Sequence, residues 1–231
     1  YATGEVEGTG NNVGGLVGSN SGTVDNCYSQ STVTSSGNNT GGLIGTNGDT
    51  GTVNDCFSSS TVTSSGNNAG GLIGWNSKTV ENCFTTGEVI GTGIAAGGLV
   101  GYNNNNATVE NCYSIASVNA AIRGGGLVGS NIGSVVNCFA AGNVEGSGGG
   151  LIGWNGIYPG YGTVTNSYWD NQSSGRTSSD GGTGKTTSDM ILQGTFTGWD
   201  FDSVWQINAD PASYPYLQWQ GNENIPYPDN E

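Results

Sequence analysis

The chain has 231 residues, with 18 acidic against 4 basic side chains, no histidine and a formal net charge of −14. This acidity argues against a nucleic-acid partner and against anionic membrane surfaces, because both carry negative charge. Only 33% of the residues are hydrophobic and glycine supplies 44, and no apolar run is long enough to cross a bilayer. A helical protein is not expected, since glycine disfavours helices and no 3.6-residue periodicity is sustained.

One phrase recurs six times from the start of the chain. It reads Gly-Gly-Leu-Val/Ile-Gly-x-Asn, then Thr/Ser-Val, then Asn or Asp, Cys and an aromatic residue. Its leucines follow one another at intervals of 24 to 29 residues, at Leu16, Leu43, Leu72, Leu99, Leu127 and Leu151. A period of this length, built from short β-forming runs between Gly and Asn, is typical of a solenoid.

Each copy predicts three short strands. One surrounds a valine column that begins at Val6, one is the Gly-Gly-Leu-Val-Gly phrase, and one is Thr-Val-x-Asn-Cys. The Gly, Asn and Ser residues between them suit tight turns. Because equivalent strands would pair from coil to coil, we predict an all-β, right-handed parallel β-helix over residues 1–168, with about six three-strand coils. Coils about 4.8 Å apart would give a rod roughly 30 Å long.

Asparagine occupies one position in every coil, two residues after the last glycine of the phrase. A residue that every coil requires is predicted to be structural, because stacked Asn side chains form hydrogen-bonded ladders. A ligand site is the alternative. The column comprises Asn20, Asn47, Asn76, Asn103, Asn131 and Asn155.

Five cysteines share another column, in which Ser167 takes the sixth place. Adjacent coils bring their Cα atoms within disulfide range, but parallel Cβ vectors and the odd count favour small buried thiols over bridges. A metal stack is disfavoured because the chain lacks histidine and any Cys-x-x-Cys pair, and we expect no cofactor. The cysteines are Cys27, Cys56, Cys83, Cys112 and Cys138.

The residue just before the asparagine column is aromatic in three coils, as Trp75, Tyr102 and Trp154. A row of exposed aromatic rings can stack on sugars, so these residues are the candidate ligand-stacking site. Packing over the adjacent turn is the alternative interpretation. Glu81 and Glu110 share a further column, about 5 Å apart, where two carboxylates could flank a glycosidic bond. No activating arginine accompanies them, and we predict that the chain is not an enzyme.

Residues 169–221 break the repeat and carry four of the six tryptophans. An uncovered last coil would expose its core and unpaired strand edges, so this segment is predicted to be a C-terminal cap. Within it, Ser188 and Asp189 suit the start of a short helical turn. Residues 222–231 are predicted to be an extended tail or linker.

A Gly184-Lys185-Thr186 run in the same segment looks like the end of a phosphate-binding loop. The position that needs the first glycine holds Ser179, and no long helical pattern follows. We therefore predict a connector with no nucleotide.

The repeated phrase resembles the GLUG motif, which is found in large bacterial surface and secreted proteins, including repeat regions of IgA-specific metalloproteases. The resemblance covers residues 1–168, and residues 181–187 resemble a segment that closes such repeats. The resemblance to the GLUG motif implies an extracellular or cell-surface role. Protease activity is not implied, because the His-Glu-x-x-His signature requires histidine.

We therefore predict a non-enzymatic extracellular adhesive or structural module. Tyr1 already stands in the aromatic column, so the N-terminal end is predicted to stack on upstream coils or on other copies, the latter giving head-to-tail filaments. A carbohydrate-binding or carbohydrate-active protein is the alternative, and the expected partner is then a surface glycan or a host protein. Ice binding through flat rows of threonine is a third possibility, but only two coils carry the Thr-x-Thr pair, which is too little surface. These threonines are Thr32, Thr34, Thr61 and Thr63.

Overall fold

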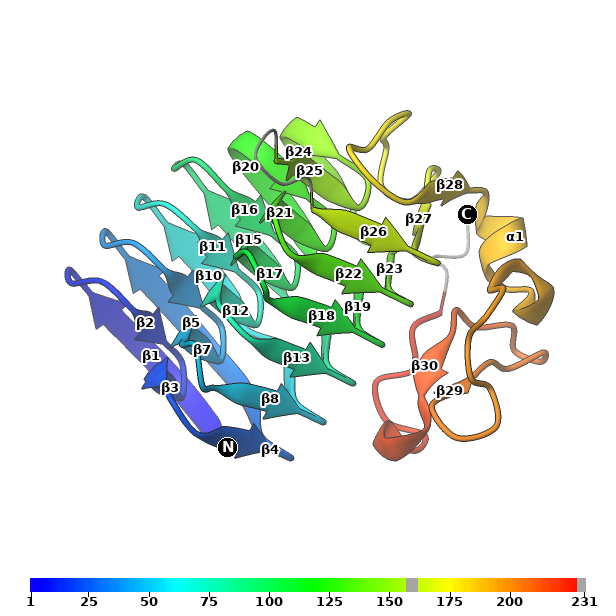
Figure 1. Cartoon of the computed structure of the whole chain (residues 1–231), viewed down its shortest axis with the longest axis horizontal. Helices are drawn as coiled ribbons and strands as arrows, with labels where there is room; N and C mark the ends of the chain where they lie inside the picture. The colour runs from blue at the N-terminus through cyan, green and yellow to red at the C-terminus, as the bar shows by residue number, and fades with distance from the viewer. Residues whose placement is uncertain (157–161, 228–231) are drawn as a thin grey trace.

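The computed structural model describes residues 1–156 and 162–227. These residues form a parallel β-solenoid of six turns (Figure 1), as the repeat predicts. Residues 157–161 of the predicted solenoid and residues 228–231 of the predicted tail lie outside the described residues. The described helices include none with the length and apolar character that a membrane span requires.

Every turn contributes strands to three parallel sheets. The second sheet is built from the Leu-Val/Ile-Gly-x-Asn phrase and consists of β3 (Val17–Asn20), β7 (Ile44–Asn47), β12 (Ile73–Asn76), β17 (Val100–Asn103), β21 (Val128–Asn131) and β25 (Ile152–Asn155). The third sheet is built from the Thr-Val pair and consists of β4 (Thr23–Asp25), β8 (Thr52–Asn54), β13 (Thr79–Glu81), β18 (Thr108–Glu110), β22 (Ser134–Val136) and β26 (Thr163–Thr165).

The first sheet combines three kinds of strand. Its valine strands are β1 (Ala2–Gly8), β5 (Tyr28–Ser35), β10 (Thr61–Ser64), β15 (Glu88–Gly91), β20 (Ser117–Gly125) and β24 (Val144–Gly149). Its short glycine strands are β2 (Val13–Gly14), β6 (Thr40–Gly41), β11 (Ala69–Gly70) and β16 (Ala96–Gly97). Its aromatic strands, apart from the start of β5, are β9 (Phe57–Ser58), β14 (Phe84–Thr85), β19 (Tyr113–Ser114), β23 (Phe139–Ala140), β27 (Tyr168–Asp170) and the closing β28 (Thr183–Lys185).

The strands pair in register, so each column of the sequence becomes a column in space. Val6 pairs with Val33, and Val33 with Val62. The leucines point inward, and all but Leu16 are fully buried. The glycines let the walls of the coil approach closely: a Cβ at Gly70 would collide with the carbonyl oxygen of Ile73. The coil is therefore thin, which explains the low hydrophobic content.

Asparagine fills one column completely and all but one position, Asp55, of a second column with a different role. In the column that begins at Asn20, each Nδ2 donates to the Oδ1 of the next coil at 2.9 Å, through all five steps from Asn20 to Asn155. In the column just before the cysteines, the residue turns the chain instead: Asn26 has φ 52° and Asn82 φ 52°, a left-handed backbone that Asn tolerates well.

The C-terminal segment closes the last turn with only part of its aromatic content. Trp169 joins the core of the solenoid, and β28 pairs with β27. Beyond them the chain forms α1 (Thr187–Met190), η1 (Gln193–Thr195), β29 (Trp205–Gln206), β30 (Tyr216–Leu217) and η2 (Gln218–Gln220). Figure 1 shows β29 and β30 beside the turns rather than beyond the last one.

The predicted cap is therefore largely a lateral element. The aromatic residues of the repeat stack into a ladder with ring centroids 4.9–5.1 Å apart from Tyr1 to Phe139. Trp199, Trp205 and Leu217 pack on the outer edge of this ladder. An apolar ladder on the outside of a coil needs cover, and the C-terminal aromatics supply it. The predicted helical turn is α1, which Thr186 caps by accepting the Asp189 N–H at 3.2 Å.

The asparagine ladder gives a stability prediction. Asn76 is fully buried; its Nδ2 donates to Asn103 and its Oδ1 accepts from Asn47. We expect Asn76→Ala to lower the free energy of unfolding by about 3 kcal/mol, because partners on both sides lose a buried hydrogen bond. Urea denaturation measures this. Asn105→Ala, at an exposed position, is the control and should change stability by less than about 0.5 kcal/mol; equal effects would contradict the ladder's role.

Candidate functional site

The three predicted stacking residues lie in one row of the second sheet. Trp75 pairs with Tyr102, Tyr102 with Ser130, and Ser130 with Trp154. All three aromatic side chains are half-buried rather than fully exposed. The Trp75 Nε1 donates to Ser77 Oγ at 2.8 Å, so its polar edge is already bound to the adjacent turn.

The faces of these rings are largely occupied by one another and by an arginine. Trp75 and Tyr102 stack with centroids 4.3 Å apart. The Arg123 guanidinium carbon lies 4.1 Å from the centre of the Trp154 ring, a cation–π contact. Burial raises the pKa of Tyr102, while the nearby Arg123 charge opposes that shift. Ser130, between Tyr102 and Trp154, is fully buried.

Sequence reasoning did not assign Arg123 to this row. It has φ 50° and lies where the pairing of β20 with β24 shifts between Ala120 and Gly124. The sequence does carry a signal for this irregularity. The turn residues that follow the valine column in earlier coils are absent between Val118 and Gly124, so β20 runs as one continuous strand of 9 residues. A sugar stacks on a ring face, and the faces between Trp75 and Tyr102, and of Trp154 toward Arg123, are covered. Ligand stacking at this row stays a prediction.

The cysteine column forms a ladder of thiols inside the solenoid. All five are free thiols in the structure; Cys27 is half-buried, and the other four are fully buried. Each of the four donates its thiol to the carbonyl oxygen two residues earlier, at 3.0–3.1 Å. Ser167 makes the same bond to Thr165 at 2.8 Å, which explains how serine replaces cysteine there. Burial raises the pKa of Cys112 well above its ordinary value, so this thiol stays protonated.

The acidic pair of the third sheet lies on adjacent rungs. Glu81 pairs with Glu110. Burial, then the charges of Glu110 and Asp55, raise the pKa of Glu81. In the described part of the chain, no three His, Cys, Asp or Glu residues are grouped so as to hold a metal ion.

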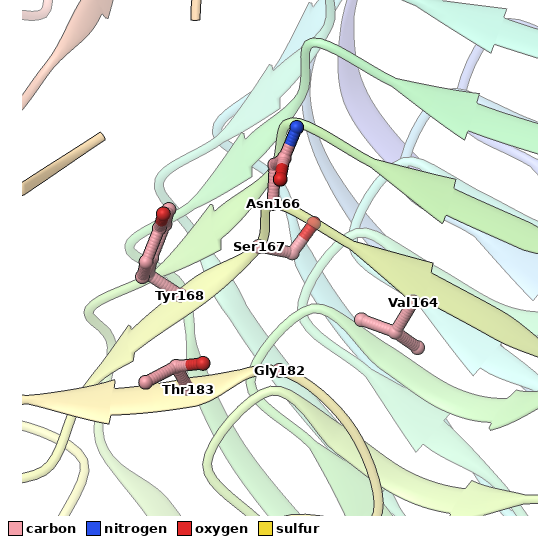
Figure 2. A pocket seen from close by; sticks show the side chains of 6 residues that line it. All are labelled: Val164, Asn166, Ser167, Tyr168, Gly182 and Thr183. Carbon is pink, nitrogen blue, oxygen red and sulfur yellow. The ribbon is translucent and has the colours of Figure 1, made fainter. Parts of the chain in front are cut away.

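A small pocket lies at the C-terminal edge of the third sheet (Figure 2). Its volume is about 230 Å³, and it is lined by Val164, Asn166, Ser167, Tyr168, Gly182 and Thr183. Two of its polar groups are engaged: Ser167 Oγ accepts the Cys138 N–H at 3.1 Å, and the Asn166 carbonyl accepts Trp199 Nε1 at 2.8 Å. The pocket marks the edge of β26, which is the last strand of its sheet.

The opposite end of the solenoid presents an uncovered cross-section. β3 and β4 are the first strands of their sheets. Leu16 is 36% exposed there, whereas the equivalent Leu43 is fully buried. Tyr1 stacks on Tyr28 with centroids 5.1 Å apart and is 77% exposed. The first coil therefore shows the same columns as the others, with their outer faces free in the described structure.

The burial of the thiol ladder predicts which cysteines an alkylating reagent can modify. An alkylating reagent should modify one cysteine, Cys27, in the folded protein, because the other four are fully buried. After denaturation without reductant it should modify all 5 cysteines of the chain. Mass spectrometry of digested peptides measures both. Fast native labelling of Cys83, or fewer than five sites after denaturation, would contradict the ladder.

The carboxylate pair predicts that removing the charge of Glu81 stabilises the folded protein at neutral pH but not in acid. The raised pKa of Glu81 means that the folded state favours its protonated form, so stability is lost as pH rises above the ordinary value of 4.5. Glu81→Gln should therefore raise the melting temperature at pH 7, and the gain should vanish below the ordinary pKa. Glu88→Gln, on an exposed position of the first sheet, is the control. A gain that persists in acid would refute the electrostatic explanation.

The comparisons with known proteins agree with the repeat. A family model described as "The GLUG motif" matches residues 9–34 and 92–119. The chain is 40% identical over 123 residues to a protein named "Putative Gly-rich membrane protein" from Evansella cellulosilytica, which covers 49% of the chain and 14% of that protein. It is 41% identical over 101 residues to "Halomucin" from Haloquadratum walsbyi, which covers 39% of the chain and 1% of that protein.

No solved structure matches the chain. The chain spans only a small part of either relative's length, so these matches describe a segment and not a whole protein. Both segments matched by the family model contain the columns that build the turns of the solenoid. The chain carries GLUG motif repeats, folded as a β-solenoid.

Proposed function

We propose that the chain is a non-enzymatic structural module of an extracellular or cell-surface protein, and that its first coil receives further coils of the same repeat. The observation that carries the proposal is the uncovered first coil. Leu16 and Tyr1 are exposed there, and β1 has its valine, Val6, in register with the coils below.

The asparagine ladder supports another coil of the same repeat as the partner of the first coil. Every Nδ2 of the Asn20 column donates toward the C-terminal end, so the Asn20 Oδ1 faces the open side. It accepts the Gly22 N–H at 3.0 Å, and its equivalent in Asn76 accepts both the Lys78 N–H and the Nδ2 of Asn47. An asparagine in an added coil would complete the same pair of bonds.

The two ends of the module are not equivalent. At the C-terminal end, Ser179 Oγ accepts the N–H groups of Leu151 and Ile152 at 3.1 and 2.9 Å, and Trp169 lies over the core. At this end β25 and β26 are the terminal strands of the second and third sheets, and the Ser179 hydroxyl takes the place of a further strand beside Ile152 of β25. This asymmetry favours further coils of the same repeat at the first coil over a head-to-tail filament of identical copies.

The relatives support a surface role. Both are far longer than the matched segment, and their names refer to a membrane protein and to a mucin-like protein. A thin, acidic solenoid with a net charge of −14 is highly solvated and resists association, as a spacer exposed outside a cell requires. Such a rod would hold an adhesive part of the protein, which binds a surface glycan or a host protein, at a distance from the cell.

The alternative function is carbohydrate binding through the row of Trp75, Tyr102 and Trp154. The observation that favours it is that the three aromatic side chains share one row of the second sheet and are each only half-buried. A glycan array with the wild type and Trp75→Ala tests it. A glycan that binds only the wild type would establish this function for the row.

The structural proposal predicts that the solenoid can be extended in register. A copy of residues 28–83 placed directly before Tyr1 keeps the native order, because a cysteine precedes the aromatic residue in the first five repeats. We expect two added coils, a rod longer by about 10 Å in small-angle X-ray scattering, and slower amide exchange in β3 and β4. The physical reason is that new strands satisfy the open edge.

The control is the same fusion with one extra residue between Cys83 and Tyr1. It shifts the register by one and turns core side chains outward, so it should not protect β3 and β4. Equal protection in both fusions, or none in either, would contradict the proposal. Filaments of the unextended chain, seen by light scattering and negative-stain microscopy, would show that copies stack instead.

A further inference from the structure

A second pocket lies where the lateral C-terminal segment meets the outer face of the first sheet. Its volume is about 240 Å³. Ile115 and Ala141, from the fifth and sixth turns, form an apolar floor, and Ser117 and Asn143, two residues further along the same turns, supply polar side chains. Ser173 and Tyr214 line it from the C-terminal residues, with Tyr227 at its rim. The pocket thus has walls from three separate parts of the chain.

One polar atom at this pocket is left without a partner. The Ser173 Oγ is buried and makes no hydrogen bond within the described residues. A buried hydroxyl without a partner is costly, and here it belongs to a residue that lines a cavity. The neighbouring loop is fixed by Asp170, which accepts the Ser173 N–H at 3.1 Å.

The aromatic wall is held rigidly. Tyr214 is 3% exposed, and its hydroxyl donates to Asp170 Oδ2 at 2.8 Å. Its backbone N–H donates to the Pro226 carbonyl at 2.9 Å. The ring is therefore preorganised, so a ligand would not have to order it.

The charges around the pocket select against anions. None of the lining side chains is charged. Three carboxylates lie close to the lining residues: Asp170 behind Tyr214, Glu88 on the rung next to Ser117, and Glu145, whose Oε1 accepts from Asn143 Nδ2 at 3.2 Å. Arg176 is engaged with the Gly146 carbonyl at 2.8 Å. An acidic sugar would be repelled by these three carboxylates, whereas a neutral ring would meet hydroxyl, amide and aromatic groups.

We propose that this pocket binds one neutral pyranose unit. Its apolar floor and Tyr214 suit the C–H faces of the ring, and Ser117, Asn143 and Ser173 suit its hydroxyl groups. A volume below the roughly 300 Å³ at which drug-sized ligand pockets begin admits a single ring and not an oligosaccharide. The site is separate from the row of Trp75, Tyr102 and Trp154, and it does not depend on the structural role proposed above.

Saturation-transfer NMR with the full chain and a panel of neutral methyl pyranosides tests the proposal. We expect at least one methyl glycoside to bind with a millimolar dissociation constant. Ser117→Leu fills the pocket from an outward-facing position and should weaken binding about tenfold or more. Thr61→Leu is the matched control, because Thr61, Glu88 and Ser117 share one column of the first sheet, and it should leave the dissociation constant unchanged.

Ser173→Ala gives a second readout that leaves the shape of the pocket intact. Loss of the hydroxyl should weaken binding about fivefold. Circular dichroism checks that each variant is folded. No signal from any methyl pyranoside with the wild type, or equal affinities for Ser117→Leu and Thr61→Leu, would overturn the proposal. Loss of binding in Trp75→Ala alone would place the sugar at the aromatic row instead.

Discussion

The in-register hydrogen bonding of one coil to the next is the constraint on which the rest of the structure depends. It places each side chain about 5 Å from its equivalent in the neighbouring coils. Only side chains that tolerate or favour contact with a copy of themselves can fill such a column. Amides do so by donating and accepting at once, as from Asn20 to Asn155. Aromatic rings do so by stacking, and thiols by bonding to the backbone.

Charges cannot repeat in this way without cost, and the third sheet shows it. Its outer column reads Asp25, Asn54, Glu81, Glu110, Val136 and Thr165. Two carboxylates are adjacent at one step only, Glu81 to Glu110, and there the pKa of Glu81 is raised. Elsewhere an amide separates them: Asn54 Nδ2 donates to Asp25 Oδ1 at 3.0 Å. The acidity of the chain is thereby spread over faces and loops rather than concentrated in one column.

The repeat made the solenoid predictable and left the surfaces unpredictable. Six copies fix the period, the register and the core columns, because each column must satisfy the same contacts in every coil. Arg123 and the C-terminal segment occur once, so no column shows what they touch. The contact of Arg123 with Trp154 depends on a shift in the pairing of β20, and the pocket at Ser173 depends on where the chain returns after the last coil. Neither follows from spacing alone.

The lateral packing of the C-terminal segment changes how the solenoid resists unfolding. In a simple solenoid each coil contacts only its neighbours, so its stability is a sum of local terms. Here the Trp219 Nε1 donates to the Asn82 carbonyl at 2.9 Å across 137 residues, and the Tyr113 hydroxyl donates to Gln220 Oε1 at 3.0 Å.

These contacts tie the third to the sixth turn into one unit. Phe84, Tyr113 and Phe139 are fully buried under the segment, whereas Tyr28 and Phe57 remain half-exposed. The first two turns lack this cover and have a free edge at Leu16. Local unfolding should therefore begin at the N-terminal turns and stop at the turns that the C-terminal segment covers. The lateral segment thus makes the stability of the described turns unequal along the solenoid, although their backbone pairing is the same.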